Sequence, residues 1–295
     1  MINKKQINHR LFFLGIVFVF MCESMRAQQT VGKHSNLGKY LTEKKWNELF
    51  PNRYNVSSYA DLLKKKKKKK DFYSYKAFMT AVDSFPQFLS GEDTVIQKRE
   101  LCAFLANIAY ETSAGWDEAP GGYYQWGLYY TQEKGCENGC PQYSDTTKQK
   151  FPPQANQSYH GRGPLQISWN YNYGQFSESY LGNKEILLKN PGLVTDNPVL
   201  CFASAIWFWI TPQYPKPSCH AIIYGQWQPT VKDISGGRLP GFGAVVNVIN
   251  GGIECNSSLS TNTKYRYGYY QFFCKYFSVD PGLNMECTMQ KPFGQ

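Results

Sequence analysis

The sequence has few of the residue patterns that bind metals or nucleotides. It contains only four histidines in 295 residues, with no HExxH pair, and its cysteines include no CxxC pair. Zinc sites commonly use these spacings, because they bring two ligands to one side of a helix or turn. A phosphate-binding loop and a GxGxxG dinucleotide motif are missing too. We therefore expect the protein to act without a metal or any other cofactor.

No stretch of the sequence is apolar over the roughly 20 residues that a membrane-spanning helix needs. Lys4, Lys5 and Arg10 precede an apolar run at 11–21, and a polar stretch follows up to Ala27. That order is typical of a cleavable secretory signal. We predict a signal peptide at 1–27, cleaved between residues 24 and 28, and a secreted, extracellular protein that does not associate with a membrane after cleavage. A short membrane anchor is the alternative interpretation.

The charge of the chain gives little basis for nucleic-acid binding. The full sequence carries +10, of which the first 27 residues carry +3 and the consecutive lysines at 64–70 carry +7. The remaining residues therefore sum to zero. Because the lysine run contains no interleaved aromatic residues, it predicts a solvated, mobile loop in place of a phosphate-binding surface. We expect no nucleic-acid partner.

The cysteine count fits an oxidising compartment. Of nine cysteines, Cys22 lies in the predicted signal, which leaves an even number in the exported chain and favours disulfide bonds. The remaining ones are Cys102, Cys136, Cys140, Cys201, Cys219, Cys255, Cys274 and Cys287. Three N-glycosylation sequons, at Asn55, Asn156 and Asn256, fit the same compartment.

Hydrophobic periodicity predicts a mainly α-helical protein with a loop-rich centre. The predicted helices are 41–50, a short one within 72–88 around 77–82, 94–114, 198–210, 244–249 and 265–277. Gly251 and Gly252 are expected to close the helix at 244–249. Residues 115–175 are rich in Gly, Tyr, Asn and Gln, and predict ordered loops with short strands. We expect a flexible segment at 28–40 and one domain at 41–295.

Two glutamates are candidates for paired acid and base catalysis. Glu111 continues the edge of the apolar stripe at 101–108, where partial desolvation favours the protonated form that a general acid requires. Glu133 lies in the loop segment that follows. Glycoside hydrolysis needs one protonated and one ionised carboxyl on either side of the scissile bond. Spacing alone does not select this pair, because Asp117 and Glu118 compete.

The residues around Glu111 narrow the choice. The stretch AFLANIAYETSAGW at 103–116 resembles the catalytic helix of family 19 glycoside hydrolases, the plant-type chitinases. The similarity continues in WGLYYTQEKG (126–135), YHGRGPLQISWNYNYG (159–174), AIWFWIT (205–211), KPSCH (216–220) and PGFGAVVNVINGGIEC (240–255). The resemblance implies a lysozyme-like, mainly α, two-lobed single domain with a loop-rich substrate cleft.

By position, the resemblance implies that Glu111 is the general acid, that Glu133 is the general base, and that Ser168 helps to hold the attacking water. The two carboxyls are then expected roughly 6.5 to 9.5 Å apart, as in inverting enzymes. Residues that it implies in sugar binding or in support of the base are Gln166, Tyr171, Asn172, Asn250, Glu254 and Arg266. As alternatives, Asn250 only ends a helix, or Arg266 is only a structural partner of Glu254.

Aromatic residues near these positions in the sequence offer flat surfaces for the C–H faces of sugar rings. They are Trp116, Tyr123, Trp126, Trp169 and Tyr171. Trp126 is a candidate sugar contact, although Trp116 and Trp126 are both favoured as core residues. Tyr171, beside two asparagines, is the better candidate for a sugar contact.

The sequence departs from the family pattern at three places. Tyr110 stands where the family usually has a histidine before the acid, and Trp169 replaces a second histidine. Tyr129 replaces a cysteine whose partner, in the N-terminal loop, is missing too. The resemblance implies a C-terminal disulfide, Cys255 with Cys287, and a shortened middle one, Cys136 with Cys140. It leaves Cys102, Cys201, Cys219 and Cys274 unassigned.

Taken together, the sequence predicts a secreted endochitinase that hydrolyses β-1,4 bonds between N-acetylglucosamine units with inversion. We expect a monomer whose partner is chitin or chitin oligosaccharides. One alternative is a chitinase-like protein that binds chitin with little or no turnover. The other is a lysozyme-like hydrolase that cleaves peptidoglycan, a related β-1,4 amino-sugar polymer.

Overall fold

The computed structural model describes residues 37–55, 71–113, 115–256 and 261–295. The predicted signal at 1–27, the rest of the N-terminal segment to residue 36 and the lysine run at 64–70 lie outside this part. Helices dominate the described residues, which confirms the mainly α prediction. The expected short strands are absent there: the central loops form only isolated bridges, such as that between Gln132 and Arg162. None of the described helices is long and apolar enough to cross a membrane.

The first described helices pack around Trp46. Residues 37–40, expected in the flexible segment, form helix α2 (Leu37–Tyr40), because Leu37 is buried against the core. Helix α3 (Glu43–Leu49) begins after Thr42, whose side chain caps it by accepting from the backbone N–H of Lys45. The Trp46 ring stacks on Phe78 of helix α5 (Tyr75–Val82) at 4.9 Å and meets the Phe50 ring at a tilt, with the centres 4.8 Å apart. Two predicted helices are thereby confirmed.

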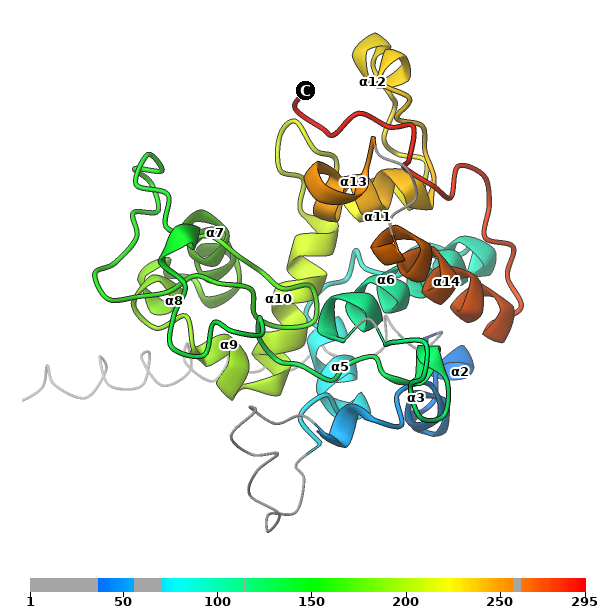
Figure 1. Cartoon of the computed structure of the whole chain (residues 1–295), viewed down its shortest axis with the longest axis horizontal. Helices are drawn as coiled ribbons and strands as arrows, with labels where there is room; N and C mark the ends of the chain where they lie inside the picture. Colours follow the sequence, from blue (N-terminus) through cyan, green and yellow to red (C-terminus); the bar gives the residue numbers. More distant parts are fainter. Residues whose placement is uncertain (1–36, 56–70, 114, 257–260) are drawn as a thin grey trace, which may run out of the picture.

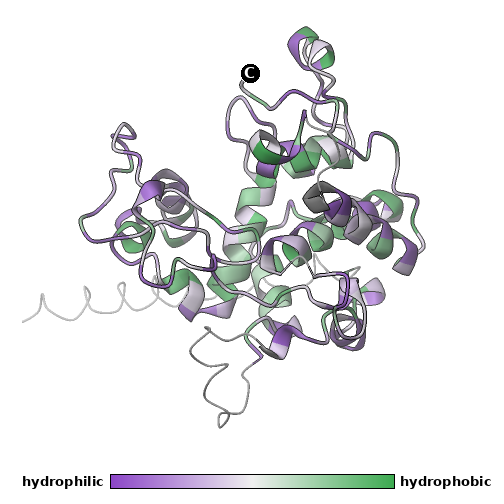
Figure 2. Ribbon diagram, viewed as in Figure 1, coloured by the Kyte–Doolittle hydropathy of each residue, from purple (hydrophilic) through white to green (hydrophobic). Residues whose placement is uncertain are grey.

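Helix α10 (Pro198–Ile210) runs through the middle of the molecule (Figure 1) and has the bounds that the sequence predicted. Asn197 caps its N-terminus and Pro198 occupies the first turn. Nine of its residues are buried, and the helix is hydrophobic over nearly its whole length in Figure 2. It contacts α5 and the short helix α11 (Cys219–Ile223), and so ties the two sides of the core together.

Two lobes flank α10 (Figure 1). One contains α7 (Asn170–Leu181), α8 (Glu185–Lys189) and α9 (Leu193–Asp196). The other contains α6 (Thr94–Thr112) and α14 (Thr261–Tyr276), which pack against each other, together with α11, α12 (Val231–Ser235) and α13 (Phe242–Glu254). The lysozyme-like, two-lobed prediction is confirmed in these helices.

Two predicted boundaries are wrong. Helix α7 begins at Asn170, inside the segment expected to be loop up to residue 175, because the buried Asn170 side chain bonds to the backbone of Asp145 and Phe151. Helix α13 does not close at Gly251 but continues to Glu254 across a kink at Asn250 (φ −142°, ψ 30°). This continuation carries Glu254 into the protein interior.

The described cysteines divide into two bridges and four thiols. Cys136 is bonded to Cys140 and Cys255 to Cys287, which confirms both expected disulfides. The four cysteines that the resemblance left unassigned, Cys102, Cys201, Cys219 and Cys274, are buried and free.

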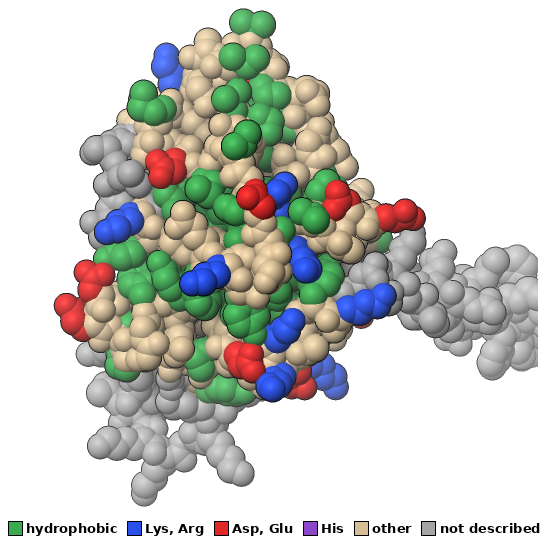
Figure 3. Space-filling model, turned by 90° about the vertical axis from the view of Figure 1, so that its right-hand side faces the viewer, with side chains coloured by type: hydrophobic (Ala, Val, Ile, Leu, Met, Phe, Trp, Pro, Cys, Tyr) green, Lys and Arg blue, Asp and Glu red, His purple; other side chains and the backbone are tan. Residues whose placement is uncertain are grey.

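One face of the molecule, seen in Figure 3, carries lysines and arginines that are spread out and interspersed with carboxylates. Hydrophobic side chains gather at its top, where α12 lies. On α12 itself Val231 and Ile234 are 85% and 58% exposed. No continuous basic patch is seen among the described residues of this face.

Candidate active site

A cavity of about 680 Å³ lies where the end of α6, the central loops, the start of α7 and the kink of α13 meet. Seven of the residues that the family resemblance implied in catalysis or sugar binding line it: Glu111, Glu133, Gln166, Ser168, Tyr171, Asn172 and Asn250. Trp169, one of the candidate aromatic surfaces, lines it too. Glu254 and Arg266 lie behind the wall as buried residues. The loops and helices thus bring together residues that are up to 139 positions apart in the sequence.

Glu111 is held by a buried arginine. Arg266 Nη2 donates to Glu111 Oε1 at 2.5 Å and to Glu254 Oε1 at 2.6 Å, while its Nη1 donates to Asn107 Oδ1 at 2.7 Å. Asn250, at the α13 kink, donates to Glu254 Oε1 at 2.8 Å. Burial works to lower the pKa of Arg266, but the carboxylates of Glu111 and Glu254 outweigh it and raise that pKa above its ordinary value. Arg266 is therefore a fixed positive charge between two carboxyls.

Tyr110, which stands in the place of the family's usual histidine, lies against this arginine. The Arg266 guanidinium carbon is 4.1 Å from the centre of the Tyr110 ring, a cation–π contact. Burial raises the pKa of the Tyr110 hydroxyl. Tyr110 therefore stays neutral and supports Arg266 without adding a charge beside Glu111.

Glu133 is oriented by two donors. The Tyr143 hydroxyl donates to Oε1 at 2.9 Å, and the backbone N–H of Gly161 donates to Oε2 at 3.2 Å. The backbone N–H of Glu133 in turn donates to Gly161 O at 2.8 Å. Burial and the nearby Glu133 raise the pKa of Tyr143 to about 12, so the hydroxyl keeps its proton. Sequence reasoning missed Tyr143, since no motif marks it.

The loop that carries Ser168 has an unusual backbone. Gln166 and Trp169 both have positive φ, 50° and 75°, a region that non-glycine residues rarely adopt. The Ser168 hydroxyl donates to Gln166 O at 2.8 Å, which leaves its lone pairs free to accept. Asn172 donates to Ser168 O at 2.9 Å, and its own Oδ1 is buried without a partner. An unpaired buried acceptor is costly, which makes it a natural contact for a bound ligand.

Aromatic side chains form one wall of the cavity. Trp169 and Tyr171 stand nearly parallel with ring centres 6.1 Å apart, and Tyr143 meets Trp169 edge-on at 5.6 Å. Trp126 does not line this cavity; its ring lies 4.8 Å from that of Trp116. The expectation that Trp116 belongs to the core is wrong, because it is 44% exposed.

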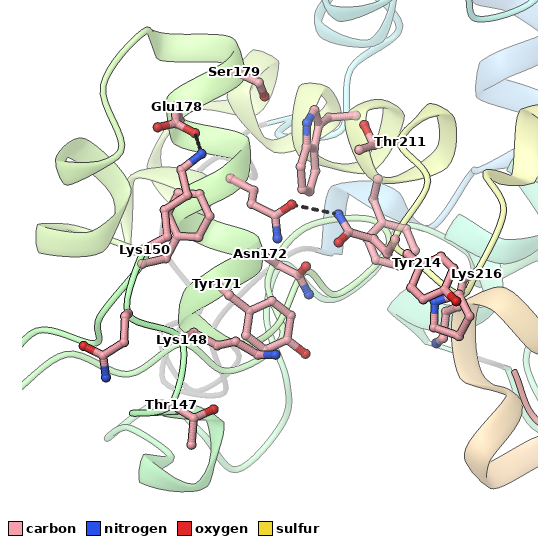
Figure 4. A pocket seen from close by; sticks show the side chains of 17 residues that line it. Thr147, Lys148, Lys150, Tyr171, Asn172, Glu178, Ser179, Thr211, Tyr214 and Lys216 are labelled. Carbon is pink, nitrogen blue, oxygen red and sulfur yellow. Dashed lines mark hydrogen bonds and ion pairs between the residues drawn. The ribbon is translucent and has the colours of Figure 1, made fainter. Parts of the chain in front are cut away.

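A second cavity, of about 850 Å³, adjoins the first and is seen in Figure 4. The two share Tyr171, Asn172, Phe208 and Lys216 as lining residues, so together they form an elongated cleft. Lys216 donates to Val248 O at 2.8 Å, and burial lowers its pKa.

In the described part of the chain, no group of three or more His, Cys, Asp or Glu residues is placed to hold a metal ion. The described cleft residues carry carboxyls, hydroxyls and amides, together with the amines of Lys134 and Lys216. Carboxyls can donate and remove protons, and a hydroxyl can orient water.

A two-lobed helical fold with two carboxyls on one cleft defines the lysozyme-like class of glycoside hydrolases. Residues 56–287 match the family model described as chitinase class I, so the chain belongs to glycoside hydrolase family 19 and is a chitinase by family. It is 44% identical over 272 residues to endochitinase CH25 of Brassica napus, covering 92% of this chain and 80% of that one. It is also 41% identical over 259 residues to inactive chitinase-like protein 1 of Hevea brasiliensis, covering 88% and 77%.

Solved structures agree with this assignment. Chitinase C from Streptomyces griseus HUT6037 superposes with a TM-score of 0.63 at 30% identity, covering 86% of this chain and 100% of that one. The class IV family 19 chitinase from Zea mays gives a TM-score of 0.60 at 30% identity, covering 84% and 98%. The relatives thus include one described as inactive.

Proposed function

We propose that this protein is a secreted endochitinase that hydrolyses β-1,4 bonds between N-acetylglucosamine units with inversion at the anomeric carbon. The observation that carries the proposal is that Glu111 and Glu133 line the same cavity together with Ser168. Each carboxyl has a different set of partners: Glu111 contacts a cation, whereas Glu133 contacts neutral donors. Two carboxyls in different surroundings suit two different roles.

Glu111 donates a proton to the glycosidic oxygen in this mechanism. When Glu111 is protonated, Arg266 and Glu254 form a neutral buried pair; when it is ionised, the three groups carry one net negative charge. The general-acid role requires Glu111 to enter the reaction protonated, with Arg266 and Glu254 as a neutral pair beside it. After the transfer, the 2.5 Å contact with Arg266 stabilises the new carboxylate.

Glu133 removes a proton from the attacking water. Tyr143 and the Gly161 N–H hold its carboxylate in one orientation, and the free lone pairs of Ser168 accept the water's other hydrogen. A water held in this way attacks from the face opposite the leaving group, and inversion follows. We expect the two carboxyls roughly 6.5 to 9.5 Å apart, the separation typical of inverting enzymes.

The polar residues around this pair bind the sugar. The unpaired Oδ1 of Asn172 accepts from a sugar N–H or O–H, Tyr171 supplies an apolar ring face, and Gln166 and Asn250 offer further amides. Trp126, with the exposed Trp116, extends the contact surface outside the cavity. The substrate in this proposal is a chitin chain or oligosaccharide.

The proposal includes export of a monomer. Its elements are a signal at 1–27 cleaved between 24 and 28, a leading segment, one catalytic domain to residue 295 and a polylysine loop at 64–70. Two disulfides and the exposed sequon asparagines Asn156 and Asn256 support passage through an oxidising, glycosylating compartment.

The test is proton NMR of the first products from chitin hexamer, read before mutarotation mixes the anomers. Initial α-anomer supports the inverting mechanism. Initial β-anomer would overturn it, and so would a carboxyl separation near 5 Å in a crystal structure. Comparison of soluble chitin oligomers with bacterial cell walls separates chitinase from peptidoglycan hydrolase activity.

The inactive relative from Hevea brasiliensis gives a specific reason to keep a second candidate, a chitin-binding protein without turnover. The Glu111→Gln variant separates the two. An endochitinase loses cleavage in this variant but still binds chitin oligomers. Equal binding by variant and parent, with cleavage by neither, would favour the binding protein.

A further inference from the structure

His160 contacts Gln132, the residue before Glu133, and the proposed mechanism gives it no role. It is only 2% exposed. Its Nε2 is 3.2 Å from Gln132 Oε1, and its Nδ1 is 2.8 Å from Ser158 Oγ. Gln132 immediately precedes Glu133, and Gly161, which donates to Glu133, immediately follows His160. The imidazole therefore links the two short segments that carry and orient the base.

Few backbone bonds hold these two segments together. Besides the bonds between Glu133 and Gly161, the N–H of Gly163 donates to Thr131 O at 2.8 Å. The segments form only an isolated bridge between Gln132 and Arg162, not a regular strand pair. Because so few backbone bonds join the two segments, a hydrogen bond between their side chains contributes more to holding them in position relative to each other.

The other end of the link reaches a covalently closed loop. Ser158 Oγ accepts from the backbone N–H of Cys140 at 2.8 Å, and Cys140 O, at 3.1 Å, is within reach as an acceptor for the Ser158 hydroxyl hydrogen. Cys140 is bonded to Cys136 and is followed by the 3₁₀ turn η3 (Pro141–Tyr143), which presents Tyr143 to Glu133. Both donors to Glu133, Tyr143 and Gly161, therefore belong to segments that His160 ties together.

The chemistry of the site favours a neutral imidazole. Burial lowers the pKa of His160 to about 4, and the nearby cation of Arg162 acts in the same direction against the weaker opposing effect of Glu137. A neutral imidazole has one N–H and one lone pair. With Gln132 Oε1 as an acceptor, Nε2 carries the hydrogen. The single Ser158 hydroxyl hydrogen, for which Cys140 O is the alternative acceptor at 3.1 Å, then points to Nδ1 at 2.8 Å.

We propose that His160 is a positioning residue for Glu133. Its neutral imidazole bridges Gln132 and Ser158 and so fixes the Glu133 carboxylate relative to the cleft. When the imidazole is protonated in acid, this bridge breaks. This inference rests on the proposed role of Glu133 as base. It assigns a function to a side chain that touches neither substrate nor the reacting atoms.

Three variants test the proposal. His160→Phe keeps a ring but removes both hydrogen bonds, and we expect kcat on chitin hexamer to fall about tenfold to hundredfold with KM within about threefold, because only the base is displaced. His160→Gln retains an N–H donor for Gln132 without titrating, and restores kcat to within about threefold. Ser158→Ala removes the hydrogen bond between Ser158 and His160. We expect the losses of kcat in Ser158→Ala and His160→Phe to be less than additive in the double variant.

The pH profile is the readout that a purely structural role would not change. In the parent, protonation of His160 breaks its two hydrogen bonds, so log kcat falls more steeply on the acid side than in His160→Gln, in which this step is absent. Nitrogen-15 NMR of the imidazole should report a neutral Nε2–H form at pH 6 and titration near pH 4. His220→Gln, which alters a different buried histidine bonded to Glu100 at 2.7 Å, is the matched control and leaves the kcat profile unchanged.

Parent-like kcat and acid slope in His160→Phe, with only a lower melting temperature, would overturn the proposal. If His160→Phe does not fold, parent-like kcat and slope in both Ser158→Ala and His160→Gln would overturn it equally. Glu133→Gln separates this failure from failure of the proposed function. A Glu133→Gln variant that still cleaves chitin refutes the base assignment, whereas an inactive one beside a fully active His160→Phe refutes only the positioning role.

Discussion

The Nη2 nitrogen of Arg266 donates to two carboxylates at once, Glu111 at 2.5 Å and Glu254 at 2.6 Å. Arg266 is fully buried, and charges interact more strongly in the protein interior than in water. Glu111, Glu254 and Arg266 are therefore strongly coupled electrostatically. Glu254 and Glu111 thus share the positive charge of Arg266.

Replacement of Glu254 by Gln tests this relationship. The variant leaves Glu111 as the only carboxylate bonded to Arg266 and removes one of the two carboxylates that hold the guanidinium in place. We expect kcat on chitin hexamer to fall, because Arg266 is no longer fixed against Glu111, and the free energy of unfolding to fall by about 3 kcal/mol, because a buried charge loses one partner. Glu185→Gln, which breaks a surface pair with Lys189 at 3.6 Å, is the control and should change neither. Parent-like kcat in Glu254→Gln would contradict a role for Glu254 in holding Arg266 against Glu111.

The two proposed catalytic carboxyls should respond differently from the carboxyls that competed with them in the sequence. Glu111→Gln and Glu133→Gln are each expected to lower kcat by about 10²- to 10⁴-fold while binding of chitin oligomers persists. Asp117→Asn and Glu118→Gln are matched controls, because both residues are exposed and neither lines the catalytic cavity. Initial rates on chitin hexamer and calorimetric binding of the same oligomer measure the two quantities. A comparable loss of kcat in the Asp117 or Glu118 variant would indicate that this residue, and not Glu111, is the general acid.

Much of the fold was predictable because its signals are local. Asn197 is a typical N-cap residue, Pro198 is a typical first-turn residue, and an apolar run follows them in the sequence. Helix α10 was therefore predicted with its observed bounds. Helix α7 gave no such signal, since NYNYGQFSESYL is mostly polar and its start depends on contacts of Asn170 with residues 19 and 25 positions away.

The site was less accessible to residue-by-residue reasoning. That Glu111 and Glu133 face one cavity follows from loops that have no periodicity, so only the family resemblance indicated it. Tyr143 and His160 were missed because their contacts with the Glu133 segment depend on the Cys136–Cys140 loop and on an isolated bridge. The continuation of α13 past Gly251 was missed as well, because tertiary packing outweighs the usual tendency of glycine to end a helix.

Removal of the Tyr143 hydroxyl should lower the catalytic efficiency of Glu133 as base while leaving substrate binding nearly unchanged. In Tyr143→Phe the Glu133 carboxylate keeps only the Gly161 N–H as donor, and a hydrogen bond to a charged group contributes about 1.5 to 3 kcal/mol. We expect kcat to fall about tenfold, with KM nearly unchanged. Tyr180→Phe, which removes a hydroxyl 3.4 Å from Ser84 Oγ and away from the catalytic cavity, is the matched control. A Tyr143→Phe enzyme with parent kcat would show that Gly161 alone orients the base.

The buried imidazole of His160 also predicts how stability depends on pH. Its pKa is about 4 in the folded protein and about 6.5 in the unfolded chain, so between these values the unfolded state binds a proton that the folded state excludes. The contribution of His160 is therefore fully present above pH 6.5 and is lost as the pH falls toward 4, at about 1.4 kcal/mol per unit of pKa depression at most.

In His160→Gln this term disappears, so urea midpoints measured from pH 7 to pH 4 should fall less steeply than in the parent. Carboxylates elsewhere titrate in both proteins and cancel in the comparison. Identical slopes for parent and variant would mean that His160 binds its proton equally in the folded and unfolded states. The imidazole would then be reached by solvent, and protonation could not release Glu133 in the way that the positioning role requires.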